Sequence, residues 1–117
     1  MKTQIVNKPW GYELIYAVTD RYVGKVLHVK KGEALSLQYH NLKDETIHIR
    51  SGKIKFYTAP SPEEALTEHI LEPGQSFHIT PKLVHRMVAL EDTDILEVST
   101  PELQDVVRLE DRYGRKS

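Results

Sequence analysis

Hydrophobic and polar residues alternate along most of the chain, and this period of two is typical of β-strands that bury one face. The clearest case is the segment 23–30, in which Val23, Lys25, Leu27 and Val29 share one face. The same alternation predicts further short strands over residues 11–18, 34–40, 46–50, 53–58, 68–71, 76–80, 84–90 and 94–99. Glycine, proline and acidic residues fall between these segments and favour tight turns. Many short strands with frequent turns predict an all-β sandwich or barrel.

Length and composition fit one domain with a modest apolar core. The chain has 117 residues, of which 39% are hydrophobic and 28% charged. We therefore expect one domain over 1–117, with an N-terminal arm over about 1–12 and a C-terminal tail over about 105–117.

Neither the net charge nor the hydropathy of the chain points to a nucleic-acid or membrane partner. Lys and Arg number 16 against 17 Asp and Glu, so no excess charge points to a nucleic-acid or membrane partner. The N-terminus has no apolar run after its first lysine, and no stretch approaches the ~20 apolar residues that a membrane span needs. We therefore expect a cytoplasmic protein without nucleic-acid or membrane partners.

The absence of cysteine excludes disulfides, thiolate metal sites and cysteine nucleophiles. A metal site must therefore use nitrogen and oxygen ligands. Gln38 and His40 are two residues apart and share a strand face, Glu45 follows after a tight turn, and His85 comes after the turn at 80–82. Each histidine alone is more often an ordinary core or surface residue. Together the four side chains can hold one divalent transition metal, and their spacing does not choose among Zn, Mn, Fe, Co and Ni.

Two further charged residues share a strand face with apolar residues. Glu97 alternates in step with Ile95, so both face the core if one does, and a buried carboxylate needs a partner or a role in ligation or proton transfer. Lys25 lies in step with Leu27 and raises the same question.

Three arginines are candidates for binding an anionic group. Arg86 follows His85, so on a regular strand it points to the opposite side unless a bulge intervenes. Arg112 and Arg115 lie in the basic tail, which is either solvated or folded over the mouth of the barrel, where it would bind an anion such as a sugar phosphate.

Two glycine-framed motifs resemble those of the cupin superfamily. The first motif contains, in order, Gly32, Gln38, His40, Glu45 and Gly52. The second runs from Gly74 to His85, which stands at the position of the last cupin metal ligand. The resemblance implies a double-stranded β-helix, a small jelly-roll barrel that holds a metal inside its mouth.

A longer series of blocks is similar to the C-terminal cupin domain of type II mannose-6-phosphate isomerases. The blocks follow the family's order over nearly the whole chain: Lys8-Pro-Trp-Gly11, Leu35-Ser-Leu-Gln38-Tyr-His40, Glu45, Ser51-Gly52, His85-Arg86, Leu96-Glu-Val98 and the ending 105–115. The resemblance implies metal-dependent aldose–ketose isomerisation of a phosphorylated sugar. Lys43 stands where the family carries an arginine thought to serve isomerisation, and Lys25 matches a basic position.

Within this resemblance Glu97 is the best candidate for the base, and Lys43, Arg86 or Arg115 would bind phosphate. The histidine-rich run of the family's first motif is largely replaced here, and this leaves two alternatives open. One is a non-catalytic cupin that binds a sugar or sugar nucleotide, and the other is a metal-dependent oxygenase. We also expect a homodimer, because small cupins commonly pair through edge strands or exchanged arms.

Overall fold

The computed structural model describes residues 2–115, which form strands, turns and loops. The strands in this part of the chain are β1 (Gln4–Lys8), β2 (Gly11–Val18), β3 (Val23–Val29), β4 (Leu37–Tyr39), β5 (Glu45–Ser51), β6 (Ile54–Ala59), β7 (Thr67–Leu71), β8 (Ser76–Ile79), β9 (Val84–Ala89), β10 (Thr93–Ser99) and β11 (Val107–Glu110). Across residues 2–115, no helix has the length and apolar character to cross a membrane.

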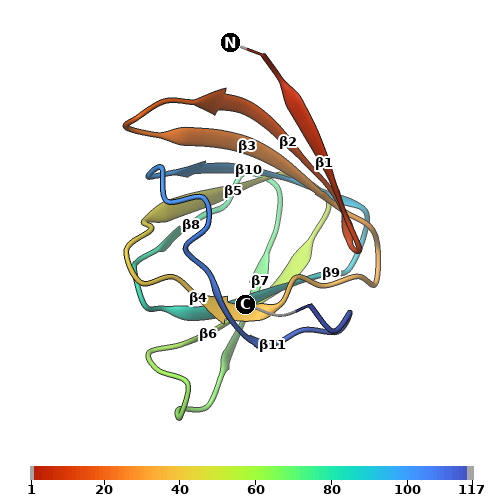
Figure 1. Cartoon of the computed structure of the whole chain (residues 1–117). Helices are drawn as coiled ribbons and strands as arrows, with labels where there is room; N and C mark the ends of the chain where they lie inside the picture. The colour runs from red at the N-terminus through yellow and green to blue at the C-terminus, as the bar shows by residue number, and fades with distance from the viewer. Residues whose placement is uncertain (1, 116–117) are drawn as a thin grey trace.

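The strands form two antiparallel sheets that face each other (Figure 1). The six-stranded sheet has the order β1-β2-β3-β10-β5-β8, and the five-stranded sheet has the order β11-β4-β9-β6-β7. Strands distant in sequence are therefore neighbours, as where β10 lies between β3 and β5. This arrangement confirms the all-β fold that the alternating pattern predicts.

The core lies between the sheets and consists of residues on their inner faces. Val23, Leu27 and Val29 of β3 are buried, and Lys25 is buried with them, as the alternation predicts. Other strands of both sheets add the largest fully buried apolar side chains, which include Ile47, Ile49, Ile54, Phe56, Ile79, Met87 and Ile95. Each such side chain contributes about 1.5–3 kcal/mol on burial, so the apolar core stabilises the barrel.

Much of the expected N-terminal arm is instead a strand of the sheet. β1 pairs along its length with β2, and Pro9 and Trp10 alone form the turn between them. Gly11 ends this turn with a φ of +152°, and a Cβ at this position would collide with the carbonyl oxygen of His28. The hairpin is therefore fixed by a close backbone contact that only glycine permits.

The C-terminal tail forms β11 and then a turn along the mouth of the barrel. β11 pairs with β4, the short strand that precedes the first cupin ligand loop (Figure 1). Beyond β11, Arg112 donates through Nη1 to the carbonyl oxygen of Gly32, and the Tyr113 hydroxyl donates to Oε2 of Glu33 at 2.6 Å. The tail is thus docked on the barrel rather than solvated.

Candidate metal centre

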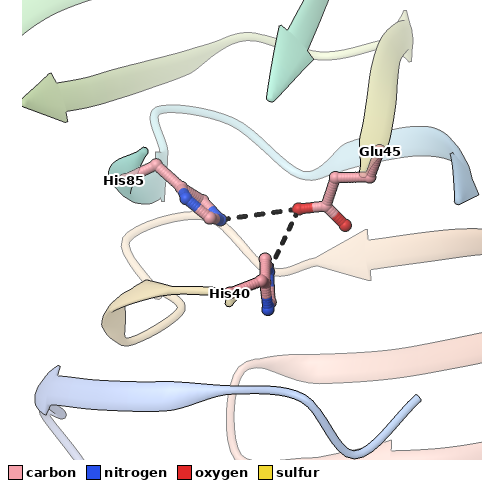
Figure 2. Close-up of side chains that lie close together, drawn as sticks. All are labelled: His40, Glu45 and His85. Carbon is pink, nitrogen blue, oxygen red and sulfur yellow. Dashed lines mark ion pairs between the residues drawn. The ribbon is translucent and has the colours of Figure 1, made fainter. Parts of the chain in front are cut away.

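Three of the four predicted ligands converge between the sheets (Figure 2). His40 follows β4, Glu45 begins β5, and His85 lies in β9. The Nε2 atoms of His40 and His85 lie 3.3 and 3.5 Å from Oε1 of Glu45, and all three ligand atoms lie within 4.8 Å of one another. Ligands about 2.1 Å from one ion lie about 3–4 Å from each other, so the spacing suits a single small cation.

The Nδ1 atoms of both histidines are held by backbone carbonyl groups. His40 Nδ1 donates to the carbonyl oxygen of Asp105, and His85 Nδ1 donates to that of Leu83 at 2.9 Å. A carbonyl oxygen accepts only, so each Nδ1 carries the hydrogen. In the neutral rings Nε2 then keeps its lone pair and faces Glu45, which is the orientation that metal-ligating histidines need.

Burial and charge support the same protonation states. Burial lowers the pKa of His85, which favours the neutral imidazole that a metal requires. Burial by itself would raise the pKa of Glu45, but its interactions with His40 and the charge of Lys43 outweigh burial and lower that pKa far below its usual range. The pair therefore offers an ionised carboxylate and a neutral nitrogen.

The His85 ring also carries the clearest sign that the site fits a cation. Its Nε2 atom is buried and makes no hydrogen bond with any described residue. A buried polar atom without a partner costs about 1–3 kcal/mol, whereas a metal–nitrogen bond would satisfy it.

Gln38 lies on the same side of the five-stranded sheet as His85. The two residues are direct partners across the β4–β9 pair, and directly opposed residues point to the same face. Gln38 also lines the interior cavity together with His40 and Glu45. The Gln38 side chain is thus on the ligand side, and its role as a fourth ligand remains a prediction.

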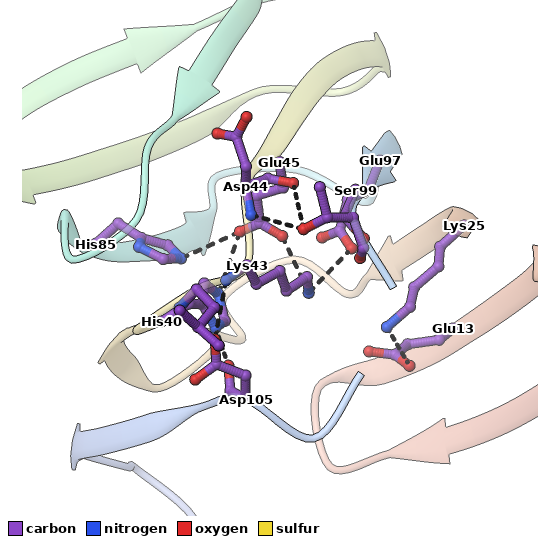
Figure 3. A network of polar contacts seen from close by, with 12 residues as sticks. Glu13, Lys25, His40, Lys43, Asp44, Glu45, His85, Glu97, Ser99 and Asp105 are labelled. Carbon is purple, nitrogen blue, oxygen red and sulfur yellow. Dashed lines mark hydrogen bonds and ion pairs between the residues drawn. The ribbon is translucent and has the colours of Figure 1, made fainter. Parts of the chain in front are cut away.

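Beside the ligands lies a cavity of about 540 Å³ that contains a network of buried charges (Figure 3). Lys43 Nζ lies 3.1 Å from Oε2 of Glu45 and 3.6 Å from Oε2 of Glu97. Farther along the wall, Lys25 Nζ lies 3.4 Å from Oε1 of Glu13. The structure therefore turns both Lys25 and Glu97 inward, in step with the apolar residues of their strands.

The buried carboxylate of Glu97 has an unusual pKa. Burial and the nearby charge of Glu45 raise the pKa of Glu97 to about 7, although Lys43 and Lys25 act in the opposite direction. Burial alone would lower the pKa of Lys43, but Glu97 and Glu45 raise it, so the ammonium keeps its proton. Near neutral pH the cavity thus holds a fixed cation next to a carboxyl group that exchanges protons readily.

None of the three arginines expected to bind the anionic group is among the residues that line the main cavity. Arg86 lies on the outer side, where it donates to the carbonyl oxygen of Leu35 and pairs with Glu110 at 3.2 Å. Arg112 is engaged by the backbone of the 32–34 turn. Arg115 pairs with a tail carboxylate and lines a smaller adjoining hollow. Strand alternation explains why Arg86 points outward: adjacent residues of a strand face opposite sides, and its neighbour His85 faces inward.

Asp105 is an organising residue that sequence reasoning missed. Its carboxylate accepts backbone N–H groups from Asn41, Leu42 and Lys43 at 3.0, 2.7 and 2.9 Å. These bonds, led by that from Leu42, lower the pKa of Asp105. Because its carbonyl group also holds the His40 ring, Asp105 fixes the whole ligand loop from the tail. The contact spans more than sixty residues, so no local pattern could have signalled it.

Solved structures confirm the cupin fold. The chain superposes on the capsular polysaccharide assembling protein CapF of Staphylococcus aureus with a TM-score of 0.77, at 20% identity over 93% of this chain and 34% of that one. An RmlC-like cupin of Shewanella frigidimarina matches with a TM-score of 0.73, at 13% identity over 88% of this chain and 87% of that one.

Curated relatives are longer proteins that match this chain over one part of their length. Mannose-1-phosphate guanylyltransferase of Escherichia coli is 34% identical over 116 residues, which is 94% of this chain and 23% of that protein. Alginate biosynthesis protein AlgA of Pseudomonas aeruginosa is 33% identical over 115 residues, with the same coverage of 94% and 23%. The chain thus spans about a quarter of their length. The model of the mannose-6-phosphate isomerase C-terminal family matches residues 1–111, and the chain belongs to that family.

Proposed function

We propose that this chain is a metal-dependent isomerase that interconverts the aldose and ketose forms of a phosphorylated sugar, with mannose 6-phosphate as the first candidate. The observation that carries the proposal is the buried Nε2 atom of His85, which has no hydrogen-bond partner among the described residues and faces Glu45 and His40 beside a large polar cavity. Family membership supports the choice of sugar.

Four residues would hold the metal: Gln38, His40, Glu45 and His85. Two neutral imidazoles with carboxylate and amide oxygens suit Zn, Mn, Fe, Co or Ni. A bound divalent ion would supply Lewis acidity and polarise a carbonyl or hydroxyl oxygen of the sugar.

Glu97 is assigned the proton-transfer role. The isomerisation needs a group that takes the proton from C2 of the aldose and returns a proton to C1. A carboxyl group with a pKa of about 7 is partly ionised at neutral pH and both accepts and donates readily. Glu97 lines the cavity, so its carboxyl group would lie next to a sugar bound there.

The lysines are assigned electrostatic roles. Lys43 lies between Glu45 and Glu97, where its ammonium would stabilise negative charge that develops on the sugar oxygens. Lys25 lines the same cavity and would bind a polar group of the substrate, in competition with its partner Glu13.

One observation favours a second candidate function, the binding of a sugar or sugar nucleotide without turnover. The Lys43 ammonium lies 3.6 Å from the Glu97 carboxylate. Such a partner favours the charged form of the carboxylate, but it also engages the oxygen that would have to accept the proton. A lysine that stays bound to Glu97 would leave no free base for the sugar carbon.

A coupled assay on metal-loaded protein separates the two functions. Mannose 6-phosphate, glucose 6-phosphate and fructose 6-phosphate are the substrates, and we expect interconversion of at least one pair. Glu97→Gln should lower kcat by about 10²–10⁴-fold and leave metal affinity intact. His40→Ala should lose both metal and turnover. His48→Ala is the matched control, because His48 pairs with Ser76 at 2.7 Å outside the cavity, and it should behave as wild type.

Saturable sugar binding without interconversion of any pair would favour the binding function. Undiminished turnover in the His40→Ala variant would refute the metal-dependent reaction itself.

A further inference from the structure

A second hollow of about 60 Å³ adjoins the main cavity. The two share five lining residues, namely Lys8, Glu13, Leu35, Gln38 and Arg108. The smaller hollow also reaches Arg115, so three of its lining side chains are cations. Its one carboxylate, that of Glu13, is already paired with Lys25. We call this hollow the basic side pocket and define it by Lys8, Arg108 and Arg115.

The register of the sheet aims Arg108 toward the candidate metal centre. Arg108 is the direct partner of Gln38 across the β11–β4 pair, and Gln38 is the direct partner of His85 across the β4–β9 pair. Directly opposed residues point to one face, so all three side chains lie on the inner side. Two strand spacings of about 4.8 Å place Arg108 about 10 Å from His85 along the sheet.

Arg115 is held in place before any ligand arrives. Its Nε and Nη2 atoms donate to the two carboxylate oxygens of Asp111 at 3.1 and 3.0 Å, and its backbone N–H donates at 2.7 Å. The Asp111 side chain is only 2% exposed. Its pKa is lowered chiefly by Arg115, and the charge of Arg108 acts in the same direction. The Asp111 carboxylate therefore orders Arg115 and balances part of the charge of both arginines.

We propose that the basic side pocket binds the anionic group of the substrate, a phosphate in the first instance. Two arginine guanidinium groups and a lysine present many N–H donors, and arginine forks match the geometry of phosphate oxygens. A volume of about 60 Å³ exceeds the roughly 10–15 Å³ that one water molecule needs and is small beside the main cavity, so it suits a single small anionic group. The backbone spacing of about 10 Å between Arg108 and His85 leaves room for an extended sugar phosphate between the two groups.

The assignment rests on the proposed function for the identity of the sugar, but it goes further by naming a separate subsite for the anion. It also replaces the expectation that Arg86 binds the phosphate, since Arg86 lies on the outer side of β9. The ligand would then extend from His40, Glu45 and His85 past Gln38 to Arg108.

Calorimetric titration of the metal-loaded full chain tests the subsite without reference to turnover. Mannose 6-phosphate, mannose and inorganic phosphate are the probes, and wild type should bind the phosphorylated sugar at least tenfold more tightly than mannose. Arg108→Gln should reduce this preference at least tenfold and leave the affinity for mannose unchanged. Lys8→Gln removes a cation from β1 rather than from the tail, and it should act in the same direction. Lys53→Gln is the control, because it removes a like charge from an exposed pair with Glu72.

Two outcomes overturn the proposal. One is an equal affinity for phosphorylated and plain mannose in wild type, absence of binding included. The other is a phosphate preference that survives in both Arg108→Gln and Lys8→Gln. The subsite and the proposed function fail separately: a phosphate preference that depends on Arg108 without any turnover refutes only the isomerase, whereas turnover with an unchanged preference in the variants refutes only the subsite.

Discussion

Removal of the Asp105 side chain should loosen the candidate metal centre while the barrel stays folded. The carboxylate holds three consecutive N–H groups of the loop between His40 and Glu45, and its own backbone carbonyl holds the His40 ring. In Asp105→Ala the carbonyl group remains, but the contacts that keep the loop against it are lost. The His40 ring can then rotate away from the orientation that metal ligation requires.

The size of the effect follows from these bonds. A hydrogen bond to a charged group contributes about 1.5–3 kcal/mol when it is shielded from water. Asp105 is partly exposed, so we take about 0.5–1 kcal/mol for each of its bonds to the loop, or about 2 kcal/mol of stability in total. Loss of a group that orients a metal ligand typically lowers metal affinity by about 10–100-fold, which is the change we expect.

Competition with a chromogenic chelator measures the zinc affinity, and urea unfolding of the metal-free protein measures the stability. Asp111→Ala is the matched control, because it removes a tail carboxylate that binds Arg115 and does not contact the 41–43 loop. Its zinc affinity should stay within about twofold of wild type. An unchanged zinc affinity in Asp105→Ala, or an equal loss in Asp111→Ala, would refute the reasoning.

Three further expectations concern stability and assembly. Glu97→Gln should stabilise the metal-free protein at pH 8 by up to about 3 kcal/mol in urea titrations and change little at pH 4. The reason is that the pKa of Glu97 is raised to about 7, so the stability from its proton, complete below about pH 4.5, is lost as pH rises through 7. Gly11→Ala should prevent native folding, as judged by circular dichroism, because a Cβ collides with His28, whereas at Gly74 a Cβ meets open space and Gly74→Ala should cost only the strain of its positive φ, about 1–2 kcal/mol. Sedimentation should give a dimer, because β1 leaves one sheet edge unpaired within residues 2–115 and Ile5 is 63% exposed; a monomer mass would contradict this.

The alternating pattern located the strands whose inner faces are apolar, and it failed where the inner face is polar. In β3 and β5 the residues in step with Leu27 and Ile47 are buried, as predicted. β1 gave no such signal, because its residues Gln4 and Val6 line the cavity while Ile5 faces outward. A strand that borders a polar cavity reverses the usual rule, so its hydrophobic pattern no longer marks the interior.

β11 shows the same reversal. Arg108 faces inward toward the cavity, while Leu109 is 41% exposed. The sequence therefore suggested a basic tail that was either solvated or folded over the mouth, and it could not say which arginine points inward. That answer depends on the register with β4, which is fixed by pairing across some seventy residues of chain.

The candidate ligands were accessible from the sequence because motif spacing encodes them. Three of the four predicted ligands offer atoms within 4.8 Å of one another, and the glutamine shares their face. The groups that orient the ligands are backbone carbonyls of Asp105 and Leu83. Every residue has a carbonyl group, so no residue type can mark such a partner, and only the fold reveals it.

The tail links the two ends of the proposed ligand site. Asp105 holds the loop that carries the metal ligands, Arg108 faces the cavity three residues later, and Arg115 is ordered by Asp111 in the following turn. One continuous segment thus sets both the orientation of His40 and the position of the cations. In the described structure β11 pairs only with β4, at one edge of the five-stranded sheet. A sugar that binds both ends would add contacts between the docked tail and the barrel, so ligand binding is expected to stabilise the folded protein further.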